Sequence, residues 1–307
     1  MWVQIPPPPP GPAPACGRIS AGPSVNRTST TAGISTAPPR ARPALVPLAD
    51  RAGPRPLRHP SVPLPRPLVP VVVVRRLNRF AVAVRPGSGK PVLRLHLPNS
   101  GRMSELIRPG TRGLAVLQRR RPRRRTAGTL LLVRHRGRWV GVDARLPNRL
   151  FEAAMRAGAL REFRRYARWR PEVLLGRGRV DFLLMGRDGV CLVETKSCNR
   201  VDGTVALFPD APTARGTRHL EDLARAARRG GRAAVVWIVQ RSDARALRPF
   251  AAADPRFARA ARRAAALGVR FYAYTCRVTP RRVTLLRRIP VRLGAVPRSV
   301  GANPADG

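Results

Sequence analysis

The sequence predicts an α+β protein in which a small closed β-barrel precedes a mixed-sheet α/β domain. Between residues 69 and 142, short strand-like runs alternate with turn-forming segments. From Pro147 onward, apolar residues follow a helical period and alternate with strand-like runs, which predicts helices packed against a sheet. The density of acidic residues also rises there, since 13 of the 16 fall between Asp143 and Asp254. We therefore expect a site that needs carboxylates in the second domain.

These changes divide the chain into four predicted segments: a disordered Pro/Arg-rich extension at 1–64, a barrel domain at 65–143, the mixed-sheet domain at 144–293 and a flexible tail at 294–307. The extension has no helical or strand period and cannot bury enough apolar surface to fold. It is either a basic arm that adds non-specific affinity or a misassigned stretch upstream of the true start of translation. We favour the second interpretation, which N-terminal sequencing of the native protein would test.

The barrel domain is predicted from six short strands, at 71–77, 79–85, 92–97, 113–118, 130–135 and 139–143. The breaks between them contain Pro, Gly, Asn and Ser, which favour tight turns. Six strands in about 75 residues are typical of a small closed barrel of OB type, whose strand face commonly binds oligonucleotides. An Arg-rich run at 119–125 interrupts the strands as a loop, which either contacts phosphates or is a solvated, self-repelling tip.

The second domain is predicted to begin with a helix. Asn148 can cap this helix, which carries Leu150, Phe151, Ala154 and Met155 on one face. The remaining elements follow in this order: strands at 172–175, 180–185 and 190–196, a helix at 217–229, a strand at 233–240, a helix at 254–267, and strands at 269–276 and 283–286. The strand at 233–240 is almost wholly apolar, which indicates a buried central position.

Composition restricts the partners. The chain has 60 Lys and Arg against 16 Asp and Glu, a formal net charge of +44. A protein with such a positive charge usually binds a polyanion such as nucleic acid. A GC-rich genome would also raise the number of Arg residues at surface positions that have no role. No apolar run approaches the length of about 20 residues that a membrane span needs, and the four cysteines lack metal-ligand spacing. The proline run after the first five residues leads us to expect no secretory signal. We expect a cytoplasmic protein with reduced thiols.

Two carboxylates and a lysine are predicted to meet on one hairpin. The turn after Gly186 joins two strands, and one register places Asp181 opposite Glu194, whereas the other places it opposite Lys196. In both registers the three side chains have the same parity and share one face of the pleat. Lys196 is one of only two lysines among the 60 basic residues, which favours a role that Arg cannot fill.

Two carboxylates this close repel each other unless a cation neutralises them, and Mg²⁺ binds one or two carboxylates together with waters and phosphate. We expect Asp181 and Glu194 to hold Mg²⁺, with Mn²⁺ as a substitute, and Lys196 to orient water or meet charge on a phosphate. Glu152, on the upstream helix, is a third candidate ligand, and Glu172 competes with it. The alternative is an exposed ion-pair cluster of little energetic value.

Basic residues near the helix expected at 217–229 are candidates for nucleic-acid contact. Arg215 and Arg218 lie near its start, where free N–H groups also favour phosphate. His219 is a candidate general base or phosphate contact, although a structural or merely exposed histidine is the more frequent case.

Asp181 and Glu194-Thr195-Lys196 on adjacent strands, after a helix that carries an acid, resemble the core of the PD-(D/E)XK nucleases. Longer segments, in order and spacing across residues 68–293, resemble the sugar fermentation stimulation protein (SfsA) family: His96-Leu97-Pro98-Asn99-Ser100-Gly101-Arg102-Met103, Leu146-Pro147-Asn148-Arg149-Leu150, Arg179-Val180-Asp181-Phe182-Leu183-Leu184, Phe208-Pro209-Asp210-Ala211-Pro212-Thr213 with Arg215-Gly216, Val239-Gln240-Arg241 and Ile289-Pro290-Val291.

The resemblance implies an N-terminal OB-like domain, a PD-(D/E)XK nuclease-like C-terminal domain and DNA binding, with a proposed regulatory role in sugar metabolism genes. By motif, Asp181, Glu194 and Lys196 would be the nuclease-like triad, and we add Arg102 of the 99–103 turn as a nucleic-acid contact. The leading hypothesis is a DNA-binding protein that grips phosphates largely independently of sequence. The alternatives are a Mg²⁺-dependent nuclease that cleaves DNA or RNA with this triad, and a structural protein whose basicity is genomic drift.

Overall fold

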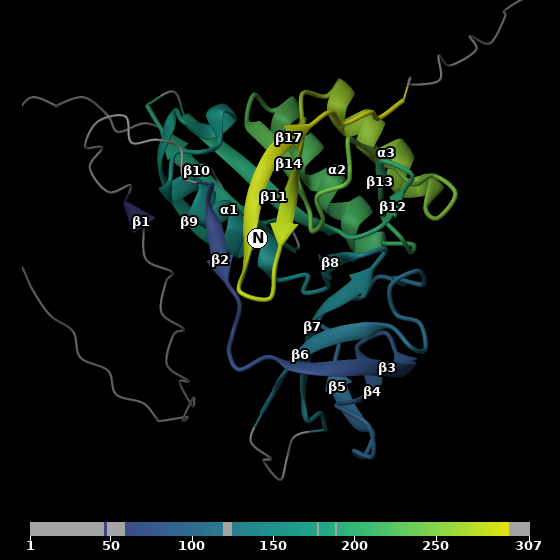
Figure 1. Cartoon of the computed structure of the whole chain (residues 1–307). Helices are drawn as coiled ribbons and strands as arrows, with labels where there is room; N and C mark the ends of the chain where they lie inside the picture. The colour runs from purple at the N-terminus through teal and green to yellow at the C-terminus, as the bar shows by residue number, and fades with distance from the viewer. Residues whose placement is uncertain (1–45, 48–58, 119–124, 177, 188, 295–307) are drawn as a thin grey trace, which may run out of the picture.

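The computed structural model describes residues 46–47, 59–118, 125–176, 178–187 and 189–294, and the structural statements below concern this part of the chain. In Figure 1 the strands of the small barrel lie below the larger domain that carries the helices. In chain order the elements are β1 Val46–Pro47, β2 Ser61–Pro63, β3 Val69–Asn78, β4 Ala81–Arg85, β5 Leu93–His96, β6 Arg112–Leu117, β7 Gly128–His135, β8 Arg138–Gly141, α1 Leu146–Arg156, η1 Arg161–Phe163, β9 Tyr166–Leu175, β10 Gly178–Gly186, β11 Gly189–Cys198, β12 Val201–Asp202, β13 Val205–Phe208, α2 Ala214–Arg228, β14 Arg232–Val239, β15 Ala246–Pro249, α3 Pro255–Ala266, β16 Arg270–Val278 and β17 Arg282–Ile289.

The N-terminal domain is a closed barrel. Its strand order is β5-β4-β3-β6-β7-β8, and a parallel contact between β5 and β7 closes it. Inward side chains such as Val82 and Leu95 fill the interior, and Met103 and Leu106 from the segment between β5 and β6 join them. The predicted OB-like barrel is confirmed, with every strand end within two residues of its predicted place. Residues 119–124 of the Arg-rich run lie outside the described residues.

The second domain is built on an eight-stranded sheet in the order β1-β9-β10-β11-β14-β16-β17-β2. β11, β14 and β16 are parallel neighbours, because the crossovers that join them contain α2 and α3. The other neighbours pair antiparallel, so the sheet is mixed, as predicted. The apolar strand β14 lies at its centre and is buried from its second residue onward.

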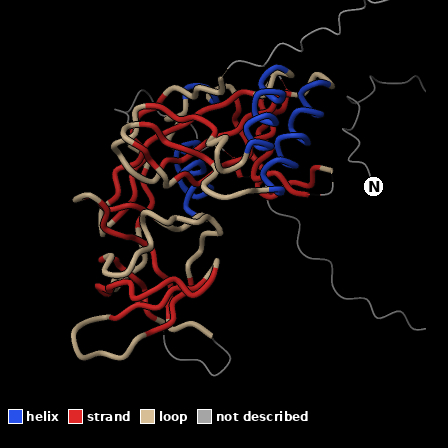
Figure 2. Tube along the Cα trace, turned by 90° about the vertical axis from the view of Figure 1, so that its right-hand side faces the viewer, coloured by secondary structure: helices blue, strands red, loops and turns tan. Residues whose placement is uncertain are grey.

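Helices cover both faces of this sheet. α1 packs Phe151 against Phe182 on one face, and α2 and α3 pack on the other, where Phe257 belongs to the same apolar cluster as Trp237. The first of these clusters also contains Leu131 of the barrel, so the two domains share a continuous apolar contact. Figure 2 shows the barrel as a group of strands and loops beneath the part that carries the helices.

Two predictions about the less regular segments were wrong. The disordered extension was predicted to reach residue 64, but β2 pairs with the edge of β17, and Val62 and Leu64 bury their side chains. An edge strand tolerates proline because its outer N–H groups need no partner in the sheet. Between the strand predicted at 190–196 and the helix predicted at 217–229, where only a loop was expected, lie β12 and β13, which form a small sheet with β15. These strands are too short to show an alternating pattern. Residues 1–45, 48–58 and 295–307 lie outside the described residues.

Candidate functional site

A cleft of about 1030 Å³ lies between the barrel and the second half of β11. The barrel side is formed by Arg79 and by Asn99, Ser100 and Gly101 of the 99–103 turn. The opposite side contains the predicted triad and the start of α2: Asp181, Glu194, Lys196, Thr213, Ala214, Arg215 and Gly216. The cleft therefore needs both domains, and the acidic cluster lies in its wall.

The hairpin of β10 and β11 decides between the two predicted registers. Phe182 pairs with Val193 and Gly186 with Gly189, which is the register that places Asp181 opposite Glu194. The register that places Asp181 opposite Lys196 is wrong. The regular pairing ends at Phe182, so the two strands separate where they enter the cleft.

Asp181 lies at an irregularity in β10. Val180 and Phe182 pack into different apolar clusters, although alternate residues of a regular strand face the same side. The Asp181 carboxylate accepts the backbone N–H of Thr195 at 2.7 Å and the side-chain amide of Asn148 at 3.1 Å. Burial, and then the charge of Glu194, raise the pKa of Asp181. The expectation of one shared face thus holds for Glu194 and Lys196, whereas Asp181 turns toward Thr195 and α1.

Glu194 is a buried carboxylate with only 4% of its surface exposed. Its Oε1 accepts hydrogen bonds from Lys196 Nζ and from His219 Nδ1, the latter at 2.5 Å. The Nε2 atom of His219 accepts the Nε–H of Arg215 at 3.3 Å, so the imidazole proton lies on Nδ1 and faces the carboxylate. Burial alone would raise the pKa of Glu194, but Lys196 and His219 bring it below its ordinary value. Glu194 is held as an anion.

The second oxygen of Glu194, Oε2, is buried and has no hydrogen-bond partner. A buried charged oxygen without a partner is costly, so its environment fits a cation that takes it as a ligand. Among the described residues, no group of three His, Cys, Asp or Glu side chains could hold a metal ion. A cation bound by Asp181 and Glu194 would complete its coordination with water, backbone or substrate oxygens, which is the pattern that Mg²⁺ prefers.

The structure does not bring the predicted ligand Glu152 into this cluster. Its carboxylate pairs with Arg156 one turn along α1, at 2.8 Å, and is not part of the cleft wall. The position facing the cluster is one turn earlier, at Asn148. The helix cap prediction for Asn148 was wrong, because Arg145 is the N-cap and the Asn148 side chain bonds to Asp181 instead.

Glu172, the competing candidate, does line the cleft. It lies on β9 between Pro171 and Val173, which pair with Phe182 and Val180, so it stands across from Asp181. Its backbone is left-handed, with φ at 53°, which interrupts the strand. Its side chain is largely exposed and lies 3.8 Å from Arg179.

The four residues predicted to contact nucleic acid fall into three positions. Arg215 lines the cleft. Arg218 and Arg102 are exposed but lie outside the cleft wall. His219 is buried, with both ring nitrogens engaged by Glu194 and Arg215, so the structure gives it a positioning role and no access to a phosphate.

The 99–103 turn joins the barrel to the second domain. Met103 N–H donates to Asp210 Oδ2 at 2.8 Å, and the Asn99 side chain donates to Asn199 Oδ1 at 3.1 Å. Gly101 approaches Asp210 so closely that a β-carbon there would lie 2.4 Å from its carboxylate. The turn is therefore locked against the second domain and fixes the barrel side of the cleft.

The sequence predicted a capping role for Asn148 and no role for Thr195, Asn199 or Asp210. The Thr195 hydroxyl donates to Asn148 Oδ1 at 2.5 Å and lies 2.9 Å from Asp181 Oδ2. Their partners are distant along the chain, so no spacing rule connects them. The available signal was that Asn148 and Asp210 occur inside the segments that resemble the family.

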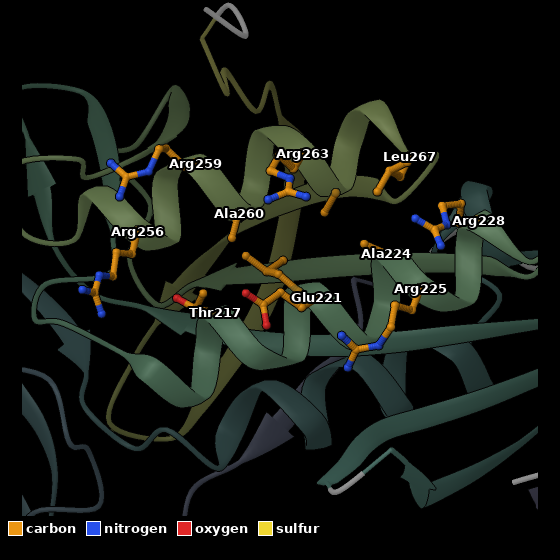
Figure 3. Close-up of a pocket in the computed structure, with 12 residues that line it drawn as sticks. Thr217, Glu221, Ala224, Arg225, Arg228, Arg256, Arg259, Ala260, Arg263 and Leu267 are labelled. Atoms are coloured by element: carbon orange, nitrogen blue, oxygen red, sulfur yellow. The ribbon is translucent and has the colours of Figure 1, made fainter. Parts of the chain in front are cut away.

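A second concavity, of about 510 Å³, lies between α2 and α3 (Figure 3). Its lining does not include Asp181, Glu194 or Lys196. We call it the α2–α3 groove. Among the residues that line it, Glu221 is the acid, and the basic ones are Arg225, Arg228, Arg256, Arg259 and Arg263. This groove provides matched arginine substitutions outside the cleft wall.

The structure also bears on the membrane and thiol predictions. In the described part of the chain, we find no helix with the length and apolarity that a membrane crossing requires. Cys191, Cys198 and Cys276 are buried free thiols, and burial raises the pKa of Cys191 to about 11. These three side chains are therefore protonated and poorly reactive at neutral pH.

The fold and the site define a two-domain protein in which an OB barrel adjoins a mixed-sheet domain with a buried carboxylate and lysine cluster. Two family models match these domains. The SfsA N-terminal OB domain matches residues 74–142, and the sugar fermentation stimulation protein RE domain matches residues 145–282. The chain belongs to the sugar fermentation stimulation protein (SfsA) family.

Individual relatives agree with this assignment. The sugar fermentation stimulation protein homolog of Moorella thermoacetica is 45% identical over 234 residues, which cover 76% of this chain and 100% of the relative. The homolog of Symbiobacterium thermophilum is 46% identical over 234 residues, with 72% and 93% covered. A solved structure of Pyrococcus furiosus SfsA in complex with Ca²⁺ has a TM-score of 0.68 at 28% identity and covers 77% of this chain and 98% of its own.

Proposed function

We propose that this chain binds nucleic acid in the cleft between its domains and hydrolyses phosphodiester bonds there with a divalent cation. The observation that carries the proposal is the environment of Glu194. One oxygen of this buried carboxylate is held by Lys196 and His219, and the other has no partner. An ion-pair cluster without a metal would leave this second oxygen unsatisfied, which favours a cation site over a purely structural one.

Asp181 and Glu194 would hold the cation, for which we propose Mg²⁺, with Mn²⁺ as a substitute. When bound, the cation would polarise a phosphodiester and lower the pKa of an attacking water. Asn148 and Thr195 hold the Asp181 carboxylate in place, and His219 holds Glu194. The Pyrococcus furiosus relative was solved in complex with Ca²⁺, a cation that takes the same kind of oxygen ligands.

Lys196 would act on the charge that develops at the reacting phosphate. Its ammonium lies in the cleft wall and is bonded to Glu194. A fixed ammonium at this point stabilises negative charge on a phosphate oxygen and orients a water molecule for attack. Because Lys presents a compact charge with rotatable donors, Arg would not reproduce its geometry.

The rest of the cleft fits the backbone of a nucleic acid. Arginines with this location are Arg79, Arg145, Arg149, Arg200 and Arg215. The start of α2 also faces the cleft and contributes the partial positive charge of a helix N-terminus. Contacts of this kind bind phosphates without reading bases, so we expect affinity for DNA, and for RNA as the alternative, that depends little on sequence and falls steeply with salt.

A cleavage assay tests this function. Labelled single- and double-stranded DNA and RNA are incubated with the protein and Mg²⁺, Mn²⁺ or chelator, beside Asp181→Ala, Lys196→Ala and the groove control Arg263→Ala. We expect metal-dependent cleavage by the wild type and by Arg263→Ala only. Salt-sensitive binding without cleavage, unchanged in Asp181→Ala and Lys196→Ala, would reduce the function to DNA binding and refute the nuclease.

A further inference from the structure

Phe80 is the exposed aromatic residue of the described chain. Its side chain is 51% exposed, whereas every other described Phe, Tyr and Trp is buried or half-buried. The ring lies on the turn between β3 and β4. A single exposed apolar side chain is common on protein surfaces, so a role for this ring depends on where the turn places it.

The backbone around Phe80 is fixed. Phe80 N–H donates to the Asn78 side chain at 2.9 Å, and the Phe80 carbonyl accepts Leu97 N–H at 2.8 Å. The Arg76 guanidinium donates to the carbonyl of Arg79 at 3.0 Å and to that of Gly101 at 2.6 Å. Arg76 thereby connects the β3–β4 turn to the 99–103 turn, so the backbone that carries the Phe80 ring is fixed in place.

The turn lies at the rim of the cleft. Arg79, the residue before Phe80, lines the cleft together with Asn99, Ser100 and Gly101. Phe80 is not among the residues that line the cleft, and its exposed ring is carried by the residue that follows Arg79 on the same turn. A strand whose phosphates meet Arg79 would pass this ring as it leaves the cleft.

We propose that Phe80 stacks on an unpaired base of a nucleic-acid strand bound in the cleft, which makes single-stranded segments the preferred substrate class. Stacking on an aromatic ring accepts any base, because every base has a π-face. Bases in a duplex are already paired and stacked, so a duplex must be opened before the ring can be used. The inference rests on the proposed nucleic-acid binding of the cleft and does not require cleavage.

The test compares one single strand with a duplex of the same length, by fluorescence anisotropy in chelator. The proteins are the wild type, Phe80→Ala, Phe80→Trp and the control Val92→Ala, which removes a 46% exposed apolar side chain elsewhere on the barrel. We expect Phe80→Ala to weaken single-strand binding by about 5- to 150-fold. Duplex binding should stay within about twofold, as for surface changes without a contact. Phe80→Trp should keep the affinity, and Val92→Ala should behave as the wild type.

A strand that carries the fluorescent base aminopurine supplies a second readout. Its emission should be quenched on binding to the wild type and to Phe80→Trp, but not to Phe80→Ala, because quenching reports stacking on the ring. Equal losses on the single strand and the duplex, or no change on either, would overturn the role of Phe80. In that case binding by the wild type would still support the cleft function, whereas failure of the wild type to bind any nucleic acid would remove both proposals.

Discussion

The two domains differ in what they bury. Among the described residues, the polar and charged residues that are almost wholly buried belong to the mixed-sheet domain, with Glu194, His219 and Arg241 among them. The barrel interior is apolar, and its Glu105, whose carboxylate oxygens are buried, lies 3.6 Å from Arg200 of the other domain. A buried polar group costs free energy unless it has a partner. The mixed-sheet domain therefore supplies the buried polar cluster on one side of the cleft, and the barrel supplies the opposite wall, with Arg79 and the 99–103 turn.

This difference separates two kinds of substitution. Changes in the buried cluster should alter metal binding and turnover, because these residues hold one another in fixed positions. Changes on the barrel side should alter binding of the nucleic acid, because its contacts are with phosphates and bases. Variants that violate this division would show that the barrel takes part in the chemistry.

The largest expected effect is that of Lys196→Ala on metal-dependent cleavage. Removing a group that stabilises charge in the transition state typically lowers turnover by about 10²- to 10³-fold. Arg79→Ala, on the barrel side, should weaken binding but leave turnover at saturating DNA close to that of the wild type. Steady-state kinetics on both variants checks this division, and a collapse of turnover in Arg79→Ala would break it.

His219→Ala should have the next largest effect, although His219 is predicted not to touch substrate. It holds Glu194, and removing such a partner of a metal ligand typically costs about 10- to 100-fold in metal affinity. His219→Gln, which keeps one donor, should restore part of this loss. Mn²⁺ titration of both variants measures their metal affinity, with exposed Arg218→Ala as the control on the same helix. A wild-type Mn²⁺ affinity in His219→Ala would contradict the positioning role.

Asp210→Ala tests the join between the domains. It removes the acceptor of the Met103 N–H and should lower the free energy of unfolding by about 1–3 kcal/mol, the cost of leaving a donor without its partner. Asp202→Ala, an exposed site, should change it by less than about 0.5 kcal/mol. Urea unfolding of both variants gives the comparison. Equal stabilities would mean that the 99–103 turn does not lock the domains.

The smallest effect concerns the salt dependence of DNA binding. Each phosphate contact that is removed should reduce the slope of log affinity against log salt by about 0.9 for duplex DNA. Arg79→Ala and Arg215→Ala, one from each side of the cleft, should each show this reduction, whereas exposed Arg187→Ala on the hairpin should not. Slopes that are unchanged in the two cleft variants would place the DNA elsewhere, and the α2–α3 groove would be the next surface to test.

The fold was predictable wherever local signals were strong. The barrel strands are bounded by Pro and Gly turns, and the apolar run of β14 marks a central strand. The first half of β9 was missed, because Arg168 and Arg170 interrupt any run of alternating apolar residues there. The strand β2 was missed because its prolines resemble those of the extension, while its pairing depends on β17, far along the chain.

The site was predictable only in part. Parity on a hairpin predicted that Glu194 and Lys196 share a face, because that relation is local. The role of Asn148 depends on its partner Asp181 in β10. Glu152 was predicted as a third ligand, but the α1 side chain that faces the acidic cluster is Asn148, one helical turn earlier. The irregularity at Asp181 arises from packing of its neighbours into two different clusters, which no local pattern reports.

The central claim is that Asp181 and Glu194 bind a divalent cation in the cleft wall. Calorimetric titration of the purified protein with Mn²⁺, beside Asp181→Ala and Glu194→Gln, tests it most directly. We expect saturable binding at the wild-type site and its loss in both variants, with the fold retained by circular dichroism. Absence of binding by the wild type, or binding that survives in both variants, would contradict it.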